Sequence, residues 1–142
     1  MRLGASKVAR TEQGRLVLAR TWRQRLRGWL WRRRPAVVTA LLLWPCMAVH
    51  SLGMTHALDV YFLDEQGRCV KRVRAMQPWR CAWHPRAVAV LELRAGQAWP
   101  GGWNDLGPRL RRILRRLPRR QGFSRWCWRR PPDWLRRTPS RS

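Results

Sequence analysis

The sequence has little negative charge, because seven Asp and Glu residues stand against 31 Lys and Arg residues, for a formal net charge of +24. Lysine is nearly absent from the basic set and occurs only at Lys7 and Lys71. Such an arginine excess is typical of a GC-rich bacterial genome, so it does not by itself indicate arginine-specific recognition. The charge favours polyanionic partners, either nucleic acid or an anionic membrane surface, through a sequence-independent and salt-sensitive attraction; a protein partner also remains open.

Closely paired cysteines are also missing. None of the four, Cys46, Cys69, Cys81 and Cys127, belongs to a Cys-x-x-Cys pair, which excludes a zinc ribbon and a thioredoxin motif. We therefore expect free, partly buried thiols that pack as small hydrophobic side chains, and we assign no metal and no cofactor.

A long hydrophobic run is absent as well. The apolar segment at residues 36–49 has 14 residues and contains Pro45, whereas a membrane-spanning helix needs about 20. Three arginines at residues 32–34 precede it in the order of an export signal, but such a signal starts nearer the N-terminus. We interpret the segment as core strands, with a membrane-associated or export segment as the alternative. The expected location is the cytoplasm or the periphery of the inner membrane, and export stays open.

The charge is concentrated at the two ends of the chain. Residues 1–35 hold 11 basic and 1 acidic side chain, residues 36–108 hold 7 and 5, and residues 109–142 hold 13 and 1. One domain is the expectation at this length. We predict a flexible basic N-terminus (1–14), a β domain (15–110) and a basic tail (111–142) that is part helical and part disordered.

Strand-forming residues dominate the middle part. Leu58, Val60 and Phe62 alternate with their neighbours and are followed by the turn sequence DEQG (64–67), which predicts a β-hairpin over residues 58–73. Further strands are expected at residues 15–19, at residues 39–50 with a break at Pro45, and at residues 87–93.

Two segments have helical spacing. Apolar residues within 21–31 predict a short N-terminal helix. In residues 109–120, leucines and an isoleucine fall on one face and arginines on the others, which predicts a basic amphipathic helix that ends at Pro118. The glycine- and proline-rich segment at 97–108 is expected to be a loop.

Five fragments, in this order, resemble a known family: RLRGWL (25–30), PCMAVHSLGM (45–54), LDVYFLDEQGRCV (58–70), QPWR (77–80) and AVLELRAG (89–96). Together they resemble the small bacterial and archaeal domain of unknown function 192. The resemblance implies a mainly β fold, a small antiparallel and partly open barrel-like domain with little helix. It implies no reaction, because the family is named for having no assigned function.

Reactive side chains gather in residues 45–67. Candidates for ligand binding there are His50, Met54, Asp59 and Asp64. Cys46 and His50 have a spacing that a metal could use on a helix, but on a strand they lie about 13 Å apart. The alternative reading is structural, with His50 and Asp59 hydrogen-bonded at strand ends and Asp64 forming the turn. No residue is assigned a catalytic role.

Arginines and tryptophans of the C-terminal part are the candidates for contact with an anionic surface. They are Arg111, Arg112, Arg115, Arg116, Arg119, Arg120, Trp126 and Trp128. Our leading hypothesis is a non-enzymatic binding or accessory module whose cationic arms hold it at an anionic surface. The alternative is an undescribed enzyme or metal-binding protein that uses Cys46, His50 and Asp59.

Overall fold

The computed structural model describes residues 8–11, 14–20 and 37–118. Its elements are β1 (Val8–Thr11), β2 (Gly14–Ala19), β3 (Val38–Leu43), β4 (Ala48–His50), β5 (Leu58–Leu63), β6 (Cys69–Met76), β7 (Cys81–Trp83), β8 (Ala89–Arg94) and α2 (Gly102–Arg116). The mainly β fold predicted from the sequence is confirmed. The helix expected at residues 21–31 lies outside the described residues.

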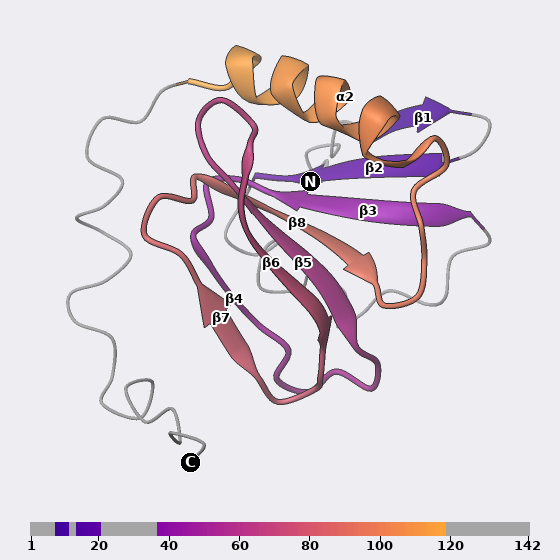
Figure 1. Cartoon of the computed structure of the whole chain (residues 1–142), viewed down its shortest axis with the longest axis vertical. Helices are drawn as coiled ribbons and strands as arrows, with labels where there is room; N and C mark the ends of the chain where they lie inside the picture. Colours follow the sequence, from indigo (N-terminus) through magenta and orange to yellow (C-terminus); the bar gives the residue numbers. More distant parts are fainter. Residues whose placement is uncertain (1–7, 12–13, 21–36, 119–142) are drawn as a thin grey trace, which may run out of the picture.

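Six of the strands form one sheet, in the order β1-β2-β3-β8-β5-β6, and β4 pairs with β7 in a separate ribbon (Figure 1). The sheet is mixed, because β2 and β3 are parallel while its other neighbours are antiparallel. It is also open, with β1 and β6 at its edges. The barrel-like, antiparallel form implied by the family resemblance is therefore corrected to an open mixed sheet.

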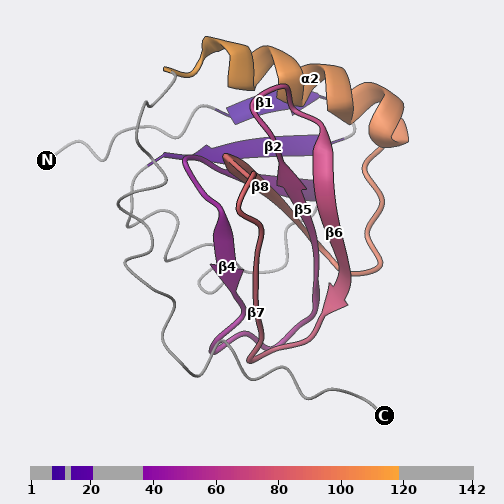
Figure 2. The same cartoon turned by 60° about the vertical axis from the view of Figure 1, so that its left-hand side comes forward.

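The sheet is covered on both faces, by α2 on one side and by the β4–β7 ribbon on the other (Figure 2). The helix-side core joins Leu106, Leu110 and Leu114 of α2 to residues such as Leu42 and Leu91 of the sheet. The ribbon-side core joins Val49 and Ala82 to sheet residues that include Leu41, Val60 and Phe62. Because both faces are buried, the central strands β3 and β8 consist mostly of apolar residues and do not alternate between apolar and polar side chains.

The predicted hairpin is confirmed as β5 and β6. Val60 faces Val73 and Tyr61 faces Arg72 across the pair. The break predicted at Pro45 is also confirmed, since it separates β3 from β4. One difference lies near the N-terminus, where residues 8–11, expected to be flexible, form β1 and pair with β2.

Helix α2 begins at Gly102, seven residues before the predicted start, inside the segment expected to be a loop. Sequence reasoning gave weight to Pro108, which removes a helical hydrogen bond at a cost of about 3 kcal/mol. Burial of the leucines of α2 offsets that cost, since each buried leucine contributes about 1.5–3 kcal/mol. The predicted end is confirmed, because Leu117, which precedes Pro118, is extended.

The position of α2 also changes the expected domain boundary. Residue 110 falls in the middle of the helix, and Leu114, beyond it, is only 7% exposed in the helix-side core. The folded unit therefore extends through α2, and residues 119–142 lie outside the described part.

Candidate functional site

Asp59, on β5, supports an irregularity in the neighbouring strand. Its Oδ1 accepts a 2.8 Å hydrogen bond from the backbone N–H of Ala75. The β5–β6 register shifts between Leu58 and Val60, and Ala75 has a φ of 46°, in the left-handed region. The carboxylate thus stabilises a bulge in β6, which is the structural role that the sequence offered as an alternative to ligand binding.

Asp64 forms the hairpin turn. Its Oδ1 accepts hydrogen bonds from the backbone N–H groups of Gln66, at 3.0 Å, and Arg68, at 2.8 Å. Gly67 completes the turn with a φ of 74°. Both observations support the turn-forming reading of Asp64.

The other ligand candidates lie on the opposite side of the sheet from Asp59. Met54 is buried in the ribbon-side core, and His50 is exposed at the end of β4, opposite Cys81. Asp59, in contrast, lines a cleft on the helix side of the sheet. The structure therefore does not bring Asp59 together with His50 and Met54.

The same separation bears on the alternative site formed by Cys46, His50 and Asp59. Cys46 is buried in the ribbon-side core, and its thiol donates a hydrogen bond to the carbonyl of Ala48 at 3.1 Å. Among the described residues, no group of three or more His, Cys, Asp or Glu side chains could hold a metal ion. The geometry gives this alternative no support.

Among the described residues, Cys69 and Cys81 form no disulfide bond. Burial raises the pKa of the Cys69 thiol and also that of the Cys81 thiol above the usual value. A nucleophilic cysteine needs a lowered pKa. Nδ1 of His84, which lies three residues after Cys81, accepts a hydrogen bond from the backbone N–H of Arg86 at 3.3 Å.

The exposed face of α2 carries the arginines proposed to contact an anionic surface. Arg111, Arg112, Arg115 and Arg116 are all exposed, and together with Pro108 they line a shallow hollow of about 360 Å³. Among the described residues, none of the four has a carboxylate within ion-pair distance. The other candidates of this set, Arg119, Arg120, Trp126 and Trp128, lie outside the described residues.

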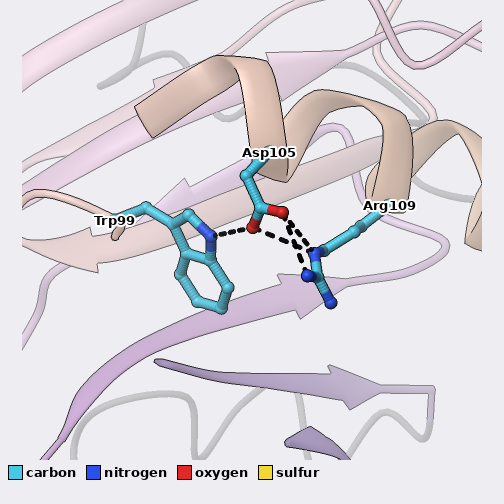
Figure 3. Close-up of polar contacts among 3 residues, drawn as sticks. All are labelled: Trp99, Asp105 and Arg109. Atoms are coloured by element: carbon cyan, nitrogen blue, oxygen red, sulfur yellow. Dashed lines mark hydrogen bonds and ion pairs between the residues drawn. The ribbon is translucent and has the colours of Figure 1, made fainter. Parts of the chain in front are cut away.

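Arg109 differs from these arginines because it forms an ion pair with Asp105, one turn earlier in the helix (Figure 3). Its Nε and Nη2 donate to the carboxylate of Asp105 at 2.9–3.1 Å, and Trp99 Nε1 donates to the same carboxylate at 2.9 Å. These bonds, that of Arg109 first and that of Trp99 second, lower the pKa of Asp105. The network fixes the first turns of α2 to the preceding loop.

A cleft of about 650 Å³ opens on the helix side of the sheet, between β5, β6, residues 96–99 and the start of α2. Its lining includes Asp59, Tyr61, Cys69, Arg72, Gln97 and Trp103. Of these residues, only Asp59 was predicted from the sequence as a candidate for ligand binding. Trp103 could have drawn attention as a tryptophan directly after two glycines, but the other residues meet only through the fold.

Glu92 was also missed by the sequence analysis. It lies in the central strand β8 between Leu41 and Val60, is 4% exposed, and has no hydrogen-bond or ion-pair partner among the described residues. Burial raises its pKa to about 8. The signal in the sequence was a single acidic residue within the apolar run AVAVLEL (87–93).

No helix in the described part of the chain is both long and apolar enough to cross a membrane.

Comparison with known proteins identifies a family and a fold. The family model DUF192, described as "Uncharacterized ACR, COG1430", matches residues 5–102. No curated protein matches the sequence.

Two solved structures are similar. A putative transcription regulator from Sinorhizobium meliloti shares 22% identity at a TM-score of 0.51, covering 66% of this chain and 74% of that one. A protein of unknown function from Novosphingobium aromaticivorans shares 21% identity at a TM-score of 0.49, covering 72% and 75%. At 22% identity, the Sinorhizobium protein supports the fold alone.

Proposed function

This chain belongs to the DUF192 family, and we propose that it is a non-enzymatic binding module that attaches to an anionic surface through the exposed arginines of α2. The observation that carries the proposal is the division of α2 into two faces. Its leucines are buried in the helix-side core, while Arg111, Arg112, Arg115 and Arg116 point to solvent without a described carboxylate partner.

The two faces also determine how the helix can bind. An amphipathic helix that inserts into a bilayer uses its apolar face, but Leu106, Leu110 and Leu114 already pack against the sheet. Only the charged face of α2 remains available to contact a partner, so attachment through α2 is electrostatic. It should weaken steeply with salt, whether the partner is a phosphate backbone or an anionic lipid headgroup.

The test compares two triple variants of the full chain. In one, Arg112, Arg115 and Arg116 of α2 are replaced by Gln; in the other, Arg74, Arg80 and Arg86, exposed on the strand and ribbon side, are replaced. Arg111 is retained because it packs against Gly67. The two variants lose the same net charge, so long-range attraction falls equally and only the local site differs.

Binding is measured against phosphatidylglycerol vesicles and a single-stranded RNA over a series of salt concentrations. We expect the α2 variant to bind more weakly than the control variant to at least one of the two. For RNA, we expect the salt slope to fall by about 1 for each arginine that contacts a phosphate. Equal weakening in both variants would mean that net charge alone drives binding, and the proposal would fail.

A further inference from the structure

The cleft on the helix side of the sheet has the size and position of a small-molecule site. Its volume of about 650 Å³ lies within the range of roughly 300–1,000 Å³ of ligand pockets. It opens beside β6, which is an edge strand and carries exposed residues along most of its length. This cleft is separate from the arginine-lined hollow of α2, because the two have no lining residue in common.

Two stacked aromatic rings form one wall of the cleft. The rings of Tyr61, from β5, and Trp103, from α2, are 5.4 Å apart between centroids and inclined by 26°. Trp103 remains 40% exposed, so the stack is not closed off from solvent. A planar ligand can stack on an accessible tryptophan ring whose orientation is fixed by a neighbouring ring.

A cation accompanies the aromatic wall. The guanidinium of Arg72 lies 4.8 Å from the centroid of the Tyr61 ring, and the Arg72 residue is exposed. Among the described residues no carboxylate forms an ion pair with it. Its N–H groups can therefore donate to an anionic group of a ligand that reaches the stack.

Acceptor groups complete the lining. The side-chain oxygen Oε1 of Gln97 is buried and has no hydrogen-bond partner, although a buried polar atom is normally satisfied. Asp59 uses its Oδ1 for Ala75, and no hydrogen bond to its Oδ2 is found among the described residues. Both oxygens can accept hydrogen bonds from a ligand that carries N–H or O–H donors.

From this combination we propose that the cleft binds a nucleotide-like ligand, a planar nitrogen heterocycle with hydrogen-bond donors and an attached phosphate. The heterocycle would stack on Trp103, its donors would meet Gln97 and Asp59, and the phosphate would pair with Arg72. A neutral sugar would supply donors but no charge for Arg72. The ligand is either a free mononucleotide or an unpaired nucleotide of RNA, because both present the same groups.

The experiment measures binding of adenosine 5′-monophosphate, adenosine, ribose 5-phosphate and a short single-stranded oligoadenylate to the full chain by calorimetry. We expect saturable binding of the monophosphate, with adenosine and ribose 5-phosphate each at least tenfold weaker. An oligoadenylate that binds much more tightly than the monophosphate, and that Arg72→Gln weakens as much as it weakens the monophosphate, would identify RNA as the source of the ligand. No saturable binding of the monophosphate at millimolar concentration, or binding of ribose 5-phosphate as tight as that of the monophosphate, would overturn the proposal.

Variants test the residues. Arg72→Gln should weaken binding of the monophosphate about tenfold but leave adenosine unchanged, and Gln97→Leu should weaken both. The matched control is Arg74→Gln, which removes an equal charge from the same strand outside the cleft. Thermal unfolding checks that each variant is folded. A control that weakens binding as much as Arg72→Gln would contradict the site. The α2 triple variant described above should retain monophosphate binding, which separates this proposal from the proposed function.

Discussion

Gly67, in the turn between β5 and β6, lies directly against Arg111 of α2. A Cβ atom at position 67 would meet Cγ of Arg111 at 2.7 Å and its Cα at 3.2 Å. The hairpin turn and the helix are thus in van der Waals contact, and Figure 1 shows the tip of the hairpin reaching α2. The hairpin that bears Asp59, Tyr61 and Arg72 is held to the helix that bears Trp103.

This contact predicts a larger effect of Gly67→Ala than of Gly96→Ala. Both glycines have a positive φ, 74° and 81°, so each alanine costs about 1–2 kcal/mol of backbone strain. Only Gly67 also lacks space, and the clash should add about 1–3 kcal/mol. Urea denaturation measures the difference, with Gly96, which has nothing within 4 Å of its Cβ position, as the control. Equal losses would show that the hairpin does not press on α2.

The bond from Asp59 to Ala75 predicts different effects of two substitutions. Asp59→Asn keeps an oxygen that can accept from the Ala75 N–H, whereas Asp59→Ala leaves that donor without its partner. We expect a loss of about 1 kcal/mol of unfolding free energy for Asp59→Ala and a smaller loss for Asp59→Asn. Chemical denaturation of the two variants is the measurement. If both lost the same amount, the charge rather than the hydrogen bond would stabilise the bulge.

The bonds that Asp105 accepts from Arg109 and Trp99 predict a dependence of stability on pH. Because they lower the pKa of Asp105, the carboxylate stabilises the folded state above its unfolded pKa of about 3.9, and this contribution is lost as the pH falls through the lower, folded value. Asp105→Asn should therefore lower the melting temperature at pH 7, and the difference from the wild type should shrink in acid. In a double-mutant cycle, Arg109→Gln should have less effect in the Asp105→Asn background than in the wild type. If the two substitutions lowered the melting temperature additively, Asp105 and Arg109 would not stabilise the fold through their interaction.

The raised pKa of Glu92 predicts a stability that changes with pH in the opposite direction to the contribution of Asp105. Between the usual pKa of 4.5 and about 8, the unfolded chain loses the proton that the folded protein keeps. The free energy of unfolding should thus fall as the pH rises through this window, by up to about 1.4 kcal/mol per unit. Glu92→Gln should flatten the curve, while Glu65→Gln, in the exposed hairpin turn, should leave it unchanged. Denaturation at several pH values between 5 and 8 makes the comparison, and a persistent slope in Glu92→Gln would contradict the assignment.

Elements with local signals were predicted correctly from the sequence. The β5–β6 hairpin follows from alternation and from a turn that Asp64 and Gly67 form within a few residues of each other. The end of α2 follows from Pro118, which restricts the residue before it. The start of α2 was missed, because Pro108 and the glycines before it are local signals against a helix that burial in the helix-side core outweighs.

The candidate site was predicted less well, since its residues meet only through long-range pairing. Asp59 was singled out beside His50 and Met54, its near neighbours in the sequence, but strand alternation directs it to the opposite face of the sheet. Its neighbours in the cleft, Gln97 and Trp103, come from segments that sequence reasoning treated as loop.

The sequence by itself determined the family, the hairpin, the strand break at Pro45 and the basic character of α2, because each depends on residue order and local backbone preference. The tertiary structure decided which face of each element is covered. Packing on both faces of the sheet buries Glu92, leaves four arginines of α2 in solvent and opens the cleft beside β6. Hydrophobic burial is non-directional, so the partner that a given apolar face finds is set by the whole fold rather than by its own sequence.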